Sequence, residues 1–183
     1  PQRMDAHLAN ARVVAQWLEA DPRVAYVNWA GLPSHPHHER ARRYLPLGPG
    51  SVFAFGVSPT DRLGGREVGA RFIENLQLAS HLANIGDART LVLHPASTTH
   101  QQLSAEQLVG AGVREDLIRL SVGLEDVEDI LWDLDQALTA ATGLPRETPG
   151  RAAGAPAGAT ADDTADAAAA ADAADVTTEG ALR

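Results

Sequence analysis

The run from Leu117 to Val122 places one charged residue, Arg119, among apolar neighbours. Arginine suits the binding of a carboxylate, because its planar guanidinium donates two parallel hydrogen bonds to the two oxygens. The residue types alone leave a second interpretation open, in which Arg119 is a buried structural partner of a nearby Asp or Glu. Arg119 is therefore the first candidate for a binding residue.

Asn84 is a second candidate, because its amide can both donate and accept hydrogen bonds. It also stands two positions before Gly86, and asparagine is common before a turn-forming glycine for backbone reasons alone. The residue type does not decide between these two interpretations. Further along, three consecutive hydroxyl side chains follow His94 in a loop and can line a pocket: Ser97, Thr98 and Thr99.

Two groups of histidines raise the question of a metal site. His94 and His100 are six positions apart, which is not a helical ligand spacing, and no third ligand is evident. The other group, His35, His37 and His38, surrounds Pro36 in a loop, and such short clusters are weak compositional signals. The sequence therefore predicts no metal site.

The chain contains no lysine, and all fifteen basic side chains are arginines. A guanidinium stays protonated and does not form an imine, so the chain has no side chain for a Schiff base. It also has no cysteine, which excludes a thiol nucleophile and fits a cytoplasmic protein. The net charge of −9 argues against a nucleic-acid partner, and no apolar run approaches the ~20 residues of a membrane span.

The spacing of apolar residues predicts the elements that position these candidates. Helices are expected at residues 4–18 and 37–44, after Gly64-Gly65, after a capping box at residues 104–107, and from Glu125 onward; strands are expected at residues 24–29, 51–57, 78–83, 90–93 and 117–122. This order predicts an α/β fold with helices packed on a mostly antiparallel sheet. We expect one domain at residues 1–145, followed by an Ala/Asp-rich disordered tail at residues 146–183.

Three stretches, residues 31–46, 80–103 and 118–129, resemble the carboxy-terminal domain of the Cys/Met-metabolism pyridoxal-phosphate enzymes. Within that family they are most similar to O-acetylhomoserine sulfhydrylases. The resemblance implies the small domain of a fold-type I enzyme. The chain, which starts on Pro1 and runs straight into a helical pattern, is expected to be a piece of a longer protein.

The resemblance also implies an activity and a set of roles. The full enzyme would use pyridoxal 5'-phosphate to convert O-acetyl-L-homoserine and sulfide into L-homocysteine and acetate, a step of methionine biosynthesis. Arg119 would hold the substrate α-carboxylate with Asn84 nearby, and residues 97–99 would line the pocket. The Schiff-base lysine would lie in a larger domain outside this chain, so we expect the chain alone to be inactive. The family resemblance further implies a homotetramer.

Two alternatives remain. A cystathionine γ-synthase or γ-lyase would share most of these features, although the sequence motifs Ser-His-Leu-Ala-Asn and Thr-Thr-His-Gln-Gln argue against it. A non-catalytic domain that binds a partner subunit would account for the missing lysine. The sequence does not identify the physiological sulfur donor or the role of the tail.

Overall fold

A computed structural model describes residues 1–98 and 102–146, which belong to one compact unit, Pro1–Glu147. The predicted tail lies outside the described residues apart from Arg146, so its boundary and its disorder stay predictions. The elements are α1 (Gln2–Glu19), β1 (Val24–Asn28), α2 (His38–Tyr44), β2 (Val52–Val57), α3 (Gly65–Asn75), β3 (Ser80–His81), β4 (Leu91–Leu93), the 3₁₀ turn η1 (Pro95–Ser97), α4 (Ala105–Gly110), β5 (Leu117–Ser121) and α5 (Val127–Thr142).

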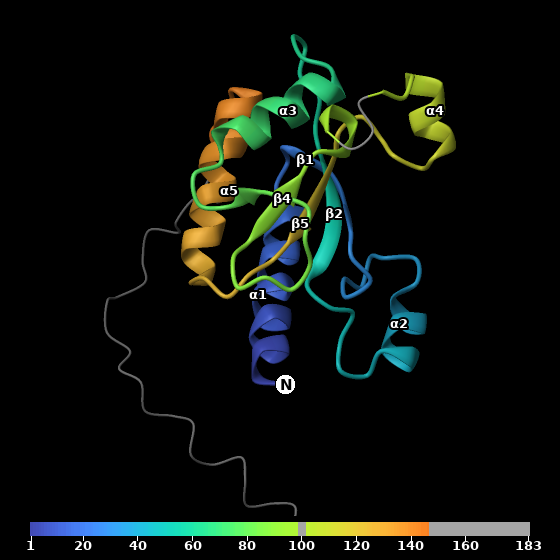
Figure 1. Ribbon diagram of the computed structural model, residues 1–183, viewed down its shortest axis with the longest axis vertical. Helices are drawn as coiled ribbons and strands as arrows, with labels where there is room; N and C mark the ends of the chain where they lie inside the picture. Colours follow the sequence, from blue (N-terminus) through green and yellow to red (C-terminus); the bar gives the residue numbers. More distant parts are fainter. Residues whose placement is uncertain (99–101, 147–183) are drawn as a thin grey trace, which may run out of the picture. The chain divides into compact units, whose positions relative to one another are not determined.

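The five strands form one sheet in the order β1-β2-β5-β4-β3 (Figure 1). Pairings β1–β2, β2–β5 and β4–β5 are antiparallel, and only the short pair β3–β4 is parallel. The prediction of a mostly antiparallel sheet is therefore confirmed. β5 is the central strand, and Arg119 lies near its middle, opposite Ala54 of β2 and Leu93 of β4.

Helices α1, α3 and α5 cover one face of this sheet. Side chains alternate across a strand, so Phe53 and Phe55 of β2 and Ile118 and Leu120 of β5 point to the same side and are buried there. These residues share one apolar core with the buried faces of the three helices. α3 packs against α5, and α1 also contacts α5 (Figure 1). The predicted α/β layering is confirmed.

The helix ends follow local chemistry. At α4 the predicted capping box is present: Ser104 N donates to Gln107 Oε1 (2.9 Å), and Gln107 N donates to Ser104 Oγ (3.3 Å). α5 begins after Asp126, whose side chain accepts a hydrogen bond from Glu128 N, and ends at Gly143 in the left-handed conformation (φ 74°). Met4, the first residue of the helix predicted at residues 4–18 from apolar spacing, is nevertheless 54% exposed, because it lies in the first turn of α1, away from the core.

No helix of the described residues has both the length and the apolar composition needed to cross a membrane.

Candidate functional site

Arg119 lies on the face of the sheet opposite the helices. Its strand neighbours Ile118 and Leu120 point into the core, so alternation directs Arg119 to the other side. Ala54, opposite it on β2, has a one-carbon side chain and cannot cover the guanidinium. Arg119 is therefore only partly buried, on the face that α1, α3 and α5 leave uncovered.

The guanidinium of Arg119 has one hydrogen bond in the described part of the chain. Its Nη2 donates to the backbone carbonyl of Asn84 at 3.3 Å, which is long for this kind of bond. Within residues 1–98 and 102–146, no Asp or Glu forms a salt bridge with it. The interpretation of Arg119 as an ion-pair partner therefore finds no carboxylate in this region. Most of its five N–H donors remain available for an anion.

The loop at residues 82–89 brings Asn84 to Arg119 through its backbone. The side chain of Asn84 makes a local bond, with Oδ1 accepting from Ile85 N (2.8 Å). Gly86 has φ 72°, a conformation that glycine adopts without strain. Arg3 of α1 donates to the Gly86 carbonyl (2.9 Å), so two arginines hold one loop. Sequence reasoning missed Arg3, because an exposed arginine in a first helical turn carries no signal of such a role.

The hydroxyl loop after β4 is organised by His94, which is fully buried. The hydroxyl of Ser97 lies 2.8 Å from His94 Nδ1, Nε2 lies 2.7 Å from the Glu115 carbonyl, and Thr98 Oγ1 donates to the His94 carbonyl (2.8 Å). Burial lowers the pKa of His94, and the charge of Arg66 acts in the same direction, against the Glu115 hydrogen bond.

His94 is thus buried and hydrogen-bonded through both ring nitrogens. The candidates Ser97 and Thr98 bond to His94 rather than to Arg119 or Asn84 in the described residues, and Thr99 lies outside them. Their pocket role stays a prediction.

A second anchor lies where β4 begins and β5 ends. The Glu125 carboxylate accepts hydrogen bonds from Thr90 N (2.6 Å) and Thr90 Oγ1 (2.8 Å), and Gly123 N donates to Thr90 Oγ1 (2.9 Å). A Cβ on Gly123 would collide with the Glu125 carboxylate and the Thr90 backbone, so only glycine fits there. The sequence assigned Glu125 to the start of the last helix. α5 instead begins at Val127 after the Asp126 cap, and the Glu125 side chain turns back to bind Thr90.

The histidines of the loop before α2 make hydrogen bonds within their own region. His35 Nδ1 accepts a hydrogen bond from His37 N (3.1 Å), and its Nε2 donates to Asn28 Oδ1 (2.9 Å). His38 Nδ1 donates to the Ala30 carbonyl (3.1 Å). In the described segments no group of three or more acidic or histidine side chains is arranged to hold a metal ion.

The model of the Cys/Met metabolism PLP-dependent enzyme family matches residues 1–139. The chain belongs to this family. It is 52% identical over 136 residues to O-acetyl-L-homoserine sulfhydrylase 1 of Thermus thermophilus and 46% identical over 138 residues to homocysteine/cysteine synthase of Kluyveromyces lactis. These matches cover 74% and 73% of this chain, but the chain spans only 31% of the length of either relative.

A crystal structure of another protein contains a similar fold. A putative O-acetylhomoserine (thiol)-lyase from Campylobacter jejuni matches with a TM-score of 0.66 and 36% identity, over 74% of this chain and 31% of that one. That structure contains an N'-pyridoxyl-lysine-5'-monophosphate residue. Pyridoxal phosphate is thus the cofactor of the family, yet no lysine occurs in these 183 residues. The residues present do not fit covalent attachment of the cofactor.

Proposed function

We propose that this chain is the substrate-recognition domain of an O-acetylhomoserine sulfhydrylase. The full enzyme would form L-homocysteine and acetate from O-acetyl-L-homoserine and sulfide. Arg119 would bind the substrate α-carboxylate, with Asn84 beside it and the loop of Ser97, Thr98 and Thr99 lining the pocket. The observation that carries this proposal is the Arg119 guanidinium, which lies on the uncovered sheet face and makes, among the described residues, a single long bond to a carbonyl oxygen.

This arrangement suits a carboxylate for a physical reason. A neutral carbonyl at 3.3 Å compensates little of the guanidinium charge, whereas a carboxylate would accept two shorter, charge-assisted bonds. The loop that supplies the Asn84 carbonyl is held by Arg3 and by Arg119 itself, so a substrate could displace one bond without detaching the loop. The names of the two relatives support the choice of substrate class.

The remaining parts of the reaction would come from outside this chain. A second, larger domain would provide the cofactor lysine, and the chain alone would be inactive because it has none. We further propose that the complete enzyme is a cytoplasmic homo-oligomer, a homotetramer as the family resemblance implies. The absence of cysteine agrees with a reducing compartment.

A chimaera tests the proposal. Residues 1–139 of this chain would replace the matching segment of the Thermus thermophilus enzyme, which is 52% identical. We expect sulfide-dependent release of homocysteine from O-acetyl-L-homoserine. A folded, cofactor-loaded chimaera that leaves this substrate untouched would refute the proposal.

Two alternatives are distinguished in the same preparation. Cleavage or synthesis of cystathionine in preference to sulfide addition would favour the cystathionine γ-lyase or γ-synthase alternative. A chimaera that assembles but has no activity on any of these substrates would favour a non-catalytic domain that binds a partner subunit.

A further inference from the structure

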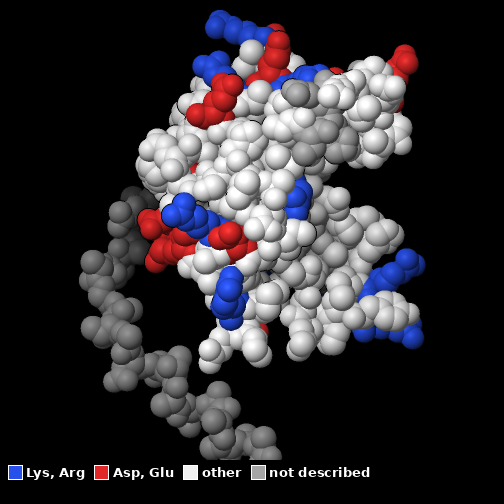
Figure 2. All heavy atoms as spheres, viewed as in Figure 1, with Lys and Arg blue, Asp and Glu red and all other residues white. Residues whose placement is uncertain are grey.

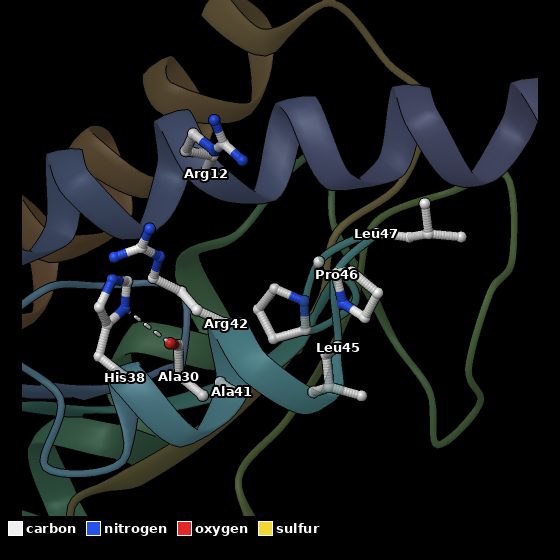
Figure 3. Close-up of a pocket in the computed structure, with 11 residues that line it drawn as sticks. Arg12, Ala30, His38, Ala41, Arg42, Leu45, Pro46 and Leu47 are labelled. Carbon is white, nitrogen blue, oxygen red and sulfur yellow. Dashed lines mark hydrogen bonds between the residues drawn. The ribbon is translucent and has the colours of Figure 1, made fainter. Parts of the chain in front are cut away.

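A pocket of about 380 Å³ lies between α1 and α2 (Figure 3), and Arg119 is not among the residues that line it. Three nitrogen-bearing side chains line it: Arg12 from α1, and His38 and Arg42 from α2. Its other wall is the turn at residues 45–49. Figure 3 shows Arg42 extending from α2 toward the helix that carries Arg12, with the His38 ring beside Arg42.

These cations have little negative charge to compensate them. The seven-residue helix α2 contains Arg40, Arg42 and Arg43 but only one carboxylate, Glu39. Arg42 Nη1 lies 3.4 Å from Glu39 Oε1, and both side chains are largely exposed, so this pair is weak. Arg12 forms no salt bridge within the described residues. In the view of Figure 2, blue atoms gather where α2 lies and no red atoms are visible on that side, although the whole chain carries a charge of −9.

The backbone holds the three groups in position. His38 Nδ1 donates to the Ala30 carbonyl at 3.1 Å, which fixes the ring and leaves Nε2 without a hydrogen-bond partner in the described residues. Arg42 follows His38 by four residues, so both project from the same face of α2. Pro46 and Pro49 restrict the opposite wall, because proline fixes its own φ angle. Two exposed arginines from different elements thus line one pocket and give it a positive charge, which favours the binding of an anion.

We propose that this pocket binds a phosphate group, either free or carried by a small metabolite. Phosphate matches the geometry because it is a dianion whose several oxygens can accept from both guanidinium forks at once, and a protonated His38 ring could also donate through Nε2. A carboxylate has one charge and two oxygens, and it would leave one guanidinium uncompensated. The site shares no residue with the Arg119 site, so it does not depend on the proposed function.

The test is a titration of the complete 183-residue chain with inorganic phosphate at constant ionic strength. NMR would follow the His38 ring and the arginine Nε–H signals. We expect saturable binding with a dissociation constant of about 1 mM or lower. Arg12→Gln and Arg42→Gln should each weaken it by about fivefold, the scale of one partly exposed charged contact. Arg71→Gln removes the same charge from the exposed side of α3 and should change nothing.

Two further experiments identify the ligand and provide variants that should still fold. A titration with glycerol 2-phosphate shows whether the pocket binds a phosphate ester or free phosphate more tightly. Tighter binding of either compound supports the site. Arg12→Lys and Arg42→Lys keep the charge but lose the fork, so each should bind between wild type and the Gln variant even if a Gln variant misfolds. Equal shifts with acetate, equal weakening by Arg71→Gln, or no saturation by about 10 mM phosphate would each overturn the proposal.

Discussion

Glu125 and Thr90 are joined by two hydrogen bonds: Glu125 Oε1 accepts from Thr90 N at 2.6 Å, and Oε2 accepts from Thr90 Oγ1 at 2.8 Å. They lie 35 positions apart in the sequence. The contact ties the segment that follows β5 to the start of β4, which pairs with β5 beside Arg119. The short loop between Asn84 and Thr90 connects this contact to the Asn84 carbonyl that Arg119 binds.

Glu125→Gln should therefore lower the free energy of unfolding. The charge that strengthens both bonds would be lost, and the Thr90 hydroxyl would have to accept from the new amide N–H instead of donating to a carboxylate oxygen. We expect a loss of about 1.5–3 kcal/mol, measured by urea denaturation. Glu74→Gln, on the exposed side of α3, is the matched control and should change stability by no more than about 0.5 kcal/mol. Equal stability of the two variants would show that the Glu125 contacts add nothing.

Several elements follow directly from local sequence. The capping box of Ser104 and Gln107, the helix after Gly64-Gly65 and the strand at residues 117–122 depend on neighbouring residues, and each was predicted from the chain alone. The position of Arg119 on the uncovered face also follows, because one position along a strand decides which face a side chain occupies.

The remaining features depend on contacts between distant residues. Glu125 was predicted to be a helix-start carboxylate because acidic residues favour that place, but its partner Thr90 is 35 positions away. Arg3 reaches Gly86 across 83 positions, and no local pattern encodes that pairing. Met4 satisfied the helical spacing, yet the core does not extend to the first turn of α1. Periodicity indicates a face of a helix but does not indicate how far the neighbouring sheet extends.

Asp133 provides a second test of stability. It is buried in α5, and its carboxylate accepts hydrogen bonds from Gln77 N (2.7 Å), Leu78 N (3.0 Å) and Ala79 N (2.9 Å), which hold the segment between α3 and β3. Asp133→Asn keeps the shape but turns an amide donor toward backbone donors. We expect the free energy of unfolding to fall by about 2–3 kcal/mol in urea denaturation.

Asp129→Asn, on the exposed side of the same helix, serves as the control for Asp133 and should cost less than about 1 kcal/mol. A wild-type denaturation curve for Asp133→Asn would mean that water or a shifted backbone satisfies these three amides.

Arg119 variants in the chimaera test the substrate contact. Arg119→Lys keeps the charge but loses the paired N–H geometry, so kcat/KM for O-acetyl-L-homoserine should fall by about 10²-fold. Cofactor absorbance should not change, because no cofactor lysine lies in this chain. Arg71→Lys is the control with an exposed arginine. If both variants kept wild-type kinetics, Arg119 would only hold the 82–89 loop through the Asn84 carbonyl.

The buried ring of His94 makes stability depend on pH. Burial lowers the pKa of His94 from 6.5, so in mildly acidic solution the unfolded chain binds a proton that the folded chain does not. The free energy of unfolding should therefore decrease as the pH falls through about 6.5, and it should keep decreasing down to the lowered pKa of the folded state. Urea denaturation at several values between about pH 8 and pH 5.5 measures this slope.

His94→Gln is the variant that isolates this effect, since glutamine does not titrate and its amide can still donate to the Glu115 carbonyl. It should be less stable than wild type at about pH 8, because the packing around a fully buried ring is disturbed, but its stability should fall less on acidification. His37→Gln, which changes an exposed loop histidine, should keep the wild-type slope. An unchanged slope in His94→Gln would assign the acid sensitivity to other groups and would leave His94 as a purely steric anchor for the Ser97 and Thr98 loop.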